Sequence, residues 1–400
     1  MKRPIHNDTC LDLTGSATTP FPWQTEKTRL FASGREAMIA LLRALALPKG
    51  TGILIPAYVP EGIIAPVRRC GFEPVLYPVS RQLAPSWPHV EDLLAQRPIG
   101  LAVLIHYFGI AQPVERFHDL CRRHGVPVVE DMAHVMHSES DSLGRTGEFV
   151  LYSLPKMLGV PDGAPLVIRK PDFDPERLAF RQDSRHILYL TKQLARLGSS
   201  TLYRKLAGST ARRLMRRFVP WRVRNFADAY DTLMAYFENP NPMSAVSRFL
   251  LKRTDWRKVI EHRVALARRY HEKLDHGAFE RLPGTGSLSH AMFGFPVLVG
   301  DREGLVGHLD RHDIRGVYLE DRWDFFPQAG REVHQEAIWT MQHHFLFPTA
   351  YSLREEEVDY VIKVANEWGV ARSHESRRDA DNVMTHAQGS NTRVNRNAEI

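Results

Sequence analysis

The sequence predicts an α/β fold with a mainly parallel sheet that is covered by helices on both faces. Helical and strand-like segments alternate from about residue 30 to residue 170. The strand-like segments are apolar runs without strict alternation, which is typical of strands buried on both faces of a parallel sheet. The chain of 400 residues, 43% of them hydrophobic, is long enough for a large core and for two or three domains.

The elements of this sheet follow one another along the chain. A helix is expected over residues 35–47, where apolar residues recur at helical spacing, and a buried strand ended by proline over 52–58. The next elements are a strand at 72–79, a helix at 90–96, a strand at 101–109, a helix at 114–125, a strand at 127–133 and a strand at 148–154. Ligands collect at the carboxyl ends of parallel strands, so we expect Tyr58, His106 and Asp131 on one rim of the sheet.

Five regions are predicted from these patterns. They are an N-terminal segment (1–29), a large domain (30–180), a basic helical insert (181–245), a smaller C-terminal α/β domain with a linking helix (246–371) and a disordered polar tail (372–400).

Positive charge is concentrated in the insert. Twelve Lys or Arg residues and one acid, Asp183, lie between Arg181 and Asn225, a balance of +11 in a chain whose net charge is +7. The high pI therefore does not indicate a nucleic-acid-binding protein. The insert has two interpretations, a solvated or packing helix and a segment that makes peripheral contact with an anionic membrane.

Compartment and metal content are predicted by exclusion. No run of about eighteen apolar residues and no secretory signal is present, so a cytoplasmic protein is expected. Cys10, Cys70 and Cys121 have neither a disulfide pattern nor a metal-ligand spacing. The adjacent His343 and His344 cannot easily face one metal ion, so no metal site is predicted.

The stretch YSLPKMLGVPDGAPLV, residues 152–167, contains a lysine, Lys156, beside an apolar run. Asp131 comes just after the apolar run of the segment 127–133, and His134 comes immediately after that segment. His106 directly follows the apolar run of the neighbouring segment, 101–109. A lysine, a carboxylate and an imidazole that converge at strand ends are what a pyridoxal phosphate site needs, because the lysine forms a Schiff base and the acid keeps the pyridine nitrogen protonated. The alternative for Asp131 is an ordinary helix N-cap.

A candidate cradle for the cofactor phosphate lies at the start of the first helix. Ser33 and Gly34 immediately precede the helix that begins near Arg35, and a helix N-terminus offers free backbone N–H groups to an anion. Ser33 is also a good N-cap, so the two interpretations remain open.

These motifs together resemble a known family. In order, SGREAM, ILIPAYVPEG, GFEPVLYPV, LIHYFG, HGVPVVEDMAH and YSLPKMLGVPDGA are similar to the DegT/DnrJ/EryC1/StrS family of pyridoxal phosphate sugar aminotransferases. The resemblance runs from about Ser33 to Gly163 and continues more weakly in the C-terminal half. It implies the fold-type I, aspartate aminotransferase-like architecture and a homodimer with active sites at the interface.

The resemblance also implies roles for single residues. Lys156 would be the lysine that bonds the cofactor and moves a proton, Asp131 would pair with the pyridine nitrogen, and His134 would bond the ring hydroxyl oxygen. Gly34 and Arg35 would hold the phosphate, and Ser153 would add its hydroxyl.

The remaining cofactor contacts are less direct. Tyr58 is the aromatic residue closest to the stacking position, and His106 lies at the same sheet edge. The loop ENPNPMS would lend Asn239, or Asn241, to the partner subunit's phosphate site.

The chain departs from the family pattern at several of these positions. Arg35 replaces a threonine, Leu151 replaces the usual phosphate serine, and Pro60 replaces the stacking aromatic residue. The sequence therefore indicates a divergent member.

Two functions remain open at this point. The first is a transaminase that converts a nucleotide-linked keto-sugar into an amino sugar for polysaccharide or secondary-metabolite synthesis, with glutamate as the donor. The second is a non-catalytic or regulatory homologue that keeps the fold.

Overall fold

The computed structural model describes residues 5–7, 9–11, 21, 23–25, 27–136, 143–180, 186–205, 240–285, 290–318 and 331–371. The strands are β1 (Thr28–Phe31), β2 (Gly52–Pro56), β3 (Glu73–Tyr77), β4 (Ile99–Ile105), β5 (Val128–Asp131), β6 (Val135–Met136), β7 (Phe149–Leu151), β8 (Ala164–Ile168), β9 (Glu280–Arg281), β10 (Ala291–Met292), β11 (Phe295–Leu298) and β12 (His344–Phe347). The α-helices are α1 (Gly34–Leu45), α2 (Glu61–Arg69), α3 (Trp87–Gln96), α4 (Val114–Arg123), α5 (His186–Lys205), α8 (Ala245–Leu251), α9 (Trp256–Lys273), α10 (Arg302–Arg311) and α11 (Gln335–His343), with a further helix over 355–371. Short 3₁₀ helices are η1 (Tyr107–Gly109), η2 (Leu154–Lys156), η3 (Pro175–Arg177) and η4 (Arg331–His334).

The large sheet has seven strands in the order β1-β8-β7-β5-β4-β2-β3. β3, β2, β4, β5 and β7 pair in parallel, whereas β8 is antiparallel to both of its neighbours. The prediction of a mainly parallel sheet is confirmed. In the register, Ile105 pairs with Asp131 and Asp131 with Leu151, so three strands end at the same level.

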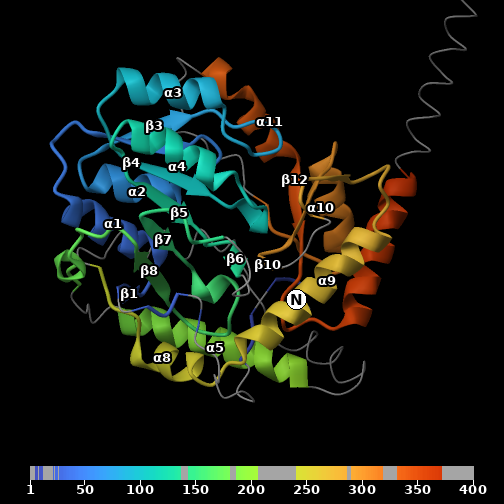
Figure 1. Ribbon diagram of the computed structural model, residues 1–400. Helices are drawn as coiled ribbons and strands as arrows, with labels where there is room; N and C mark the ends of the chain where they lie inside the picture. Colours follow the sequence, from blue (N-terminus) through green and yellow to red (C-terminus); the bar gives the residue numbers. More distant parts are fainter. Residues whose placement is uncertain are drawn as a thin grey trace, which may run out of the picture.

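Helices α1 to α4 surround this sheet (Figure 1). The central strands are buried along their length, and the side chains of Leu101, Val103 and Val129 have no exposed surface. Burial on both faces explains why these strands are continuous apolar runs in the sequence.

Predicted strand ends were wrong in more than one place. The strand expected over 148–154 ends at Leu151, because Leu154 begins the 3₁₀ helix η2. The strand expected over 101–109 ends at Ile105, because the chain turns into the 3₁₀ helix η1. Phe108 has a left-handed backbone (φ 58°) and Gly109 has φ 110°, and neither fits an extended strand.

The C-terminal part contains a smaller antiparallel sheet in which β11 lies between β12 and β9. Helix α9 runs beside it, and α11 lies near α3 (Figure 1). Strand β10 instead pairs with β6, with Met292 opposite Val135, and so brings Phe293 next to His134. The division into five regions stays a prediction. Residues 181–185 and 206–239 of the insert, and the whole tail, lie outside the described residues.

Within the described residues, every helix is too short or too polar to cross a membrane.

Candidate active site

Lys156 is the last residue of η2, in the loop that connects β7 with β8. The backbone N–H of Leu154 donates to the carbonyl of Gly163 (2.9 Å), which closes the loop around the lysine. Within the described residues, Nζ has no hydrogen-bond or ion-pair partner, and it lies 5.8 Å from the ring centroid of Phe293. Burial lowers the pKa of Lys156 from 10.5 to about 8, with Asp131 opposing this effect and the Arg35 charge adding to it. The amine is therefore prepared to act as a nucleophile near neutral pH.

Asp131 is the last residue of β5 and is 5% exposed. Its Oδ1 accepts a hydrogen bond from the N–H of Ala133 (2.8 Å), as in a local turn. Its Oδ2 receives no hydrogen bond from the described residues. Burial raises the pKa of this carboxyl, and the nearby Lys156 charge partly offsets the effect. The structure thus brings the predicted acid and the predicted lysine together.

His134 lies in a stack of nearly parallel rings. Its ring is 5.1 Å from that of Phe293 on one side and 5.7 Å from that of Phe108 on the other, each at an interplanar angle of 11°. The N–H of Phe108 donates to Nδ1 (3.3 Å), so Nε2 carries the proton of the neutral ring. Burial, helped by the charge of Lys156, holds the pKa of His134 well below 6.5. The imidazole is therefore a neutral donor beside Lys156.

Tyr58 lies in the aromatic cluster next to this stack. Its ring makes edge contacts with Tyr107 (5.2 Å) and His344 (5.5 Å), and His344 stacks on the other face of Phe108. Tyr58 is 1% exposed, and burial raises the pKa of its phenol well above 10. Its ring therefore forms a packed, apolar side of the region next to His134.

His106 is directed away from the lysine. Its Nε2 faces Oε1 of Glu130 (3.0 Å), and its Nδ1 accepts from the N–H of Gln112 (2.9 Å). Burial would raise the pKa of Glu130, but the hydrogen bond and charge of His106 outweigh it and hold the pKa below 4.5. Glu130 also accepts from the N–H groups of Gly144 and Gly147, so the pair orders the loop before β7. The sequence did not identify Glu130.

Ser33 is the N-cap of α1. Its Oγ accepts from the N–H of Glu36 (3.3 Å) and donates to Oε2 of the same residue (2.7 Å). This arrangement agrees with the N-cap interpretation. The hydroxyl is thus already occupied, and only backbone groups of this turn remain for an anion.

Arg35 extends from the same turn toward α2. A Cβ placed on Gly62 would lie 2.3 Å from its Nη2 and 2.4 Å from its Nε, so only glycine lets the guanidinium rest there. Gly34 is less constrained, because an added Cβ would make an ordinary 3.6 Å contact with Leu151. A cation thus lies near enough to Lys156 to lower its pKa.

The last two predicted contacts differ in what the structure shows. Ser153 is partly exposed, and its hydroxyl makes no hydrogen bond to the described residues. Leu151, at the family's serine position, is buried. Asn239 lies outside the described residues, whereas Asn241 is buried and donates from both its N–H (3.1 Å) and its Nδ2 (2.8 Å) to Oε1 of Glu36.

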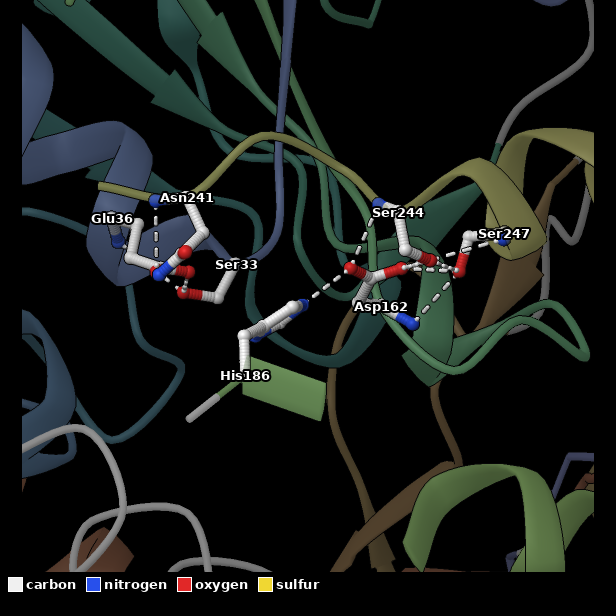
Figure 2. A network of polar contacts seen from close by, with 7 residues as sticks. All are labelled: Ser33, Glu36, Asp162, His186, Asn241, Ser244 and Ser247. Carbon is white, nitrogen blue, oxygen red and sulfur yellow. Dashed lines mark hydrogen bonds and ion pairs between the residues drawn. The ribbon is translucent and has the colours of Figure 1, made fainter. Parts of the chain in front are cut away.

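Sequence reasoning missed the buried polar residues that support these elements. Glu36 and Asp162 each accept several hydrogen bonds from residues far along the chain (Figure 2). Glu36 lies three positions after Ser33, and no local signal pointed to its distant partner.

The site combines an amine with a lowered pKa, a buried carboxylate and a neutral imidazole, close to the carboxyl ends of parallel strands. The fold that carries these groups is the fold-type I, aspartate aminotransferase-like architecture. Residues 27–183 match the model of the DegT/DnrJ/EryC1/StrS aminotransferase family.

A curated relative is UDP-4-amino-4-deoxy-L-arabinose--oxoglutarate aminotransferase of Shewanella sediminis, 27% identical over 126 residues. The match covers 31% of this chain and 32% of that protein, about a third of the relative's length.

The fold extends over most of the chain in solved structures. DesV of S. venezuelae superposes with a TM-score of 0.61 at 18% identity, covering 86% of this chain and 85% of DesV. The putative sugar aminotransferase Spr1654 of Streptococcus pneumoniae, solved in its PMP form, gives 0.61 at 14% identity and covers 90% of each chain. The fold class predicted from the sequence is confirmed.

Proposed function

We propose that this protein is a pyridoxal phosphate-dependent aminotransferase that converts a nucleotide-linked keto-sugar into an amino sugar, with glutamate as the amino donor. The observation that carries the proposal is the position of Lys156 beside Asp131. Neither Lys156 Nζ nor Asp131 Oδ2 has a hydrogen-bond partner among the described residues. Two reactive groups left without partners at the edge of the sheet are typical of a site built for a ligand.

The residues fit the chemistry of the cofactor. When bound, pyridoxal phosphate supplies an aldehyde for the lysine amine and a ring that accepts electrons. Lys156 would bond the aldehyde and, when released, move a proton between the substrate carbon and the cofactor. Asp131 would hold the proton on the pyridine nitrogen through its open oxygen. Burial raises the pKa of this acid, and the positive charge of Lys156 opposes that effect; the charge of a pyridinium at the same place would act in the same direction.

The surrounding groups complete the donor set. His134 would donate from Nε2 to the ring oxygen, because its Nδ1 is already used by Phe108. Arg35 and the hydroxyl of Ser153 would serve the phosphate, with Arg35 supplying charge in place of the threonine hydroxyl. Tyr58 would form an apolar wall, while His106 would act on the site through Glu130.

The relatives support the substrate class. Spr1654 is a putative sugar aminotransferase, DesV was solved in complex with a ketimine intermediate, and the Shewanella relative is named for an amino sugar nucleotide. On the resemblance to this family we propose a cytoplasmic homodimer that acts in polysaccharide or secondary-metabolite synthesis. Peripheral membrane contact through the basic insert is a further prediction, on residues mostly outside those described.

A second candidate is a non-catalytic homologue. Leu151 is buried at the position where the family has a phosphate-binding serine, and Asn241 is hydrogen-bonded to Glu36. Both features favour this candidate, because they remove phosphate contacts that the family uses.

The test is the absorption spectrum of the purified protein with added pyridoxal phosphate. Wild type should develop the visible band of the lysine-bound cofactor, Lys156→Ala should not, and Lys258→Ala, which changes an exposed lysine of α9, should behave as wild type. Glutamate should then bleach the band, since bleaching requires a working half-reaction. A band that glutamate leaves unchanged supports the non-catalytic homologue. Absence of the band from wild type contradicts both the cofactor and the reaction.

A further inference from the structure

Asp162 lies six residues after Lys156 in the same loop and takes no part in the chemistry described above. We propose that it is a positioning residue, which sets the place of Lys156 by tying the loop that carries this lysine, residues 152–163, to the first residue of α5 and to the N-cap of α8. The proposal rests on the proposed function in one respect, that the position of Lys156 matters because its amine reacts.

The carboxylate of Asp162 is fully buried and has hydrogen-bond donors on both oxygens (Figure 2). Oδ2 accepts from the N–H of Ser244 (3.0 Å) and faces Nε2 of His186 (2.9 Å). Oδ1 accepts from Oγ of Ser244 (2.8 Å) and from Oγ of Ser247. In turn, the N–H of Asp162 donates to Oγ of Ser247 (3.2 Å). A buried carboxylate is costly unless it is surrounded by donors, so this set of contacts resists rearrangement.

The donors come from two separated parts of the chain. His186 is the first residue of α5, and Ser244 is the N-cap of α8. His186 and Ser244, which are far apart in the sequence, therefore both bond the carboxylate of Asp162. In Figure 2, His186 lies between the Asp162 contacts and those of Glu36.

The link from Asp162 to the lysine is short. The neighbouring Gly163 accepts from the N–H of Leu154 (2.9 Å), two residues before Lys156, and donates to the carbonyl of Ala32 (2.8 Å). Gly163 has φ 137°, and a Cβ there would lie 2.9 Å from Cε of Met243. A shift of Asp162 would thus displace Gly163. Through the two hydrogen bonds of Gly163, it would also displace the turn that carries Lys156 and the backbone of Ala32.

The segment that carries Ser244 is held on its other side by the second buried carboxylate, Glu36. Asn241 donates to Glu36, and its carbonyl accepts from the N–H of Ala32 (2.9 Å). The N–H of Met243 donates to the carbonyl of Leu30 (2.9 Å). Residues 241–243 therefore lie along the edge of the sheet formed by β1, and the segment 241–244 connects the first turn of α1 to the loop that carries Lys156.

The donor count explains why a carboxylate is required at position 162. Four donor groups converge on its two oxygens, whereas asparagine has one acceptor oxygen, and its amide group would face donors. Asp162→Asn keeps the shape but breaks the network. Ser247→Ala is the milder variant, because it removes one donor to Oδ1 and the acceptor of the Asp162 N–H and leaves the other contacts of the carboxylate in place. Asp174→Asn is the matched control, because Asp174 likewise accepts a hydrogen bond from a backbone N–H, but it is exposed and lies beyond the opposite end of β8.

The first measurement is amide hydrogen exchange of the cofactor-free protein, read by mass spectrometry. Asp162→Asn should speed exchange in residues 154–163 about tenfold, since a buried hydrogen bond to a charged group is lost. Ser247→Ala should have a smaller effect in the same peptide, and Asp174→Asn none. If Asp162→Asn does not fold, Ser247→Ala decides the outcome.

The second measurement separates positioning from mere support. The rate at which an amine-selective reagent modifies Lys156 is followed against pH, and its midpoint in wild type should be about 8. A loosened loop exposes the amine to water, so Asp162→Asn should move the midpoint up by about one pH unit. Faster exchange with an unchanged midpoint would show a purely structural residue and would overturn the proposal, as would no change in either measurement.

Neither measurement needs a working enzyme. If wild type forms no absorption band with pyridoxal phosphate but both effects appear, the proposed function fails and the positioning role stands. If the band forms and both effects are absent, the positioning role fails alone.

Discussion

Replacing Lys156 with methionine should stabilise the cofactor-free protein at neutral pH, although it removes the residue on which the proposed function depends. Burial lowers the pKa of this lysine from 10.5 to about 8. The free-energy equivalent is about 3 kcal/mol of destabilisation by the buried charge. Lys156 is partly exposed, so solvent reduces this figure, and we expect a gain of about 1–3 kcal/mol in the free energy of unfolding. Methionine has a similar length and needs no charge partner.

The gain should depend on pH in a definite direction. Below pH 8 the lysine is protonated in both the folded and the unfolded protein, so the full cost of the buried charge is present. Between 8 and 10.5 the folded protein has lost this proton while the unfolded chain keeps it, and the stability of wild type rises with pH. Above 10.5 both states are neutral at this position, and the advantage of Lys156→Met should be gone.

The assay is urea unfolding of cofactor-free wild type and variant at several pH values across this window, with the same slope required of both proteins. Lys258→Met, at an exposed position of α9, is the control and should change stability little at any pH. A variant that is no more stable than wild type at neutral pH, or a gain that stays constant with pH, would refute the idea that Lys156 carries a strained charge.

Two further predictions concern the neighbours of this lysine. Gly62→Ala should leave thermal stability nearly unchanged, because the displaced Arg35 side chain is flexible, but it should weaken pyridoxal phosphate binding about tenfold and raise the pKa of Lys156. Titration of the visible absorption band checks the affinity, and unaltered binding would show that Arg35 does not serve the phosphate. His134 should stay neutral as the pH falls through 6.5, since burial holds its pKa well below that value. Exchange of its ring carbon proton, measured by mass spectrometry with the exposed His124 as internal reference, should show no midpoint near 6.5. A midpoint there would contradict the buried stack.

The central part of the site could be predicted from the sequence, because its members follow strands that are adjacent in the sheet. Asp131 ends β5 and pairs with Leu151 of β7, five residues before Lys156. Apolar runs and short connections are local features, and the parallel register then places the residues after them at one edge. For the same reason His106 was expected there. Its backbone does lie at that edge, but Ile105 pairs with Asp131, so the side chain of His106, the next residue, lies on the opposite face of the sheet, where it meets Glu130.

Tertiary structure alone placed the supporting residues. Glu36 meets Asn241 across 205 positions, and Asp162 meets Ser244 across 82. Phe293 stacks on His134 because β10 pairs with β6. Such pairs arise when distant segments fold against each other, and neither residue's immediate neighbours specify the partner.

The order of apolar strands, glycines and a few reactive side chains in the sequence was sufficient to predict the parallel sheet and the meeting of the lysine with its acid. How those groups are held was decided only on folding, when burial removed water from their surroundings. The buried carboxyl groups of Glu36 and Asp162 then required donors, and these came from whichever segments packed against them. The pKa of Lys156 and the network around Asp162 both result from that loss of water.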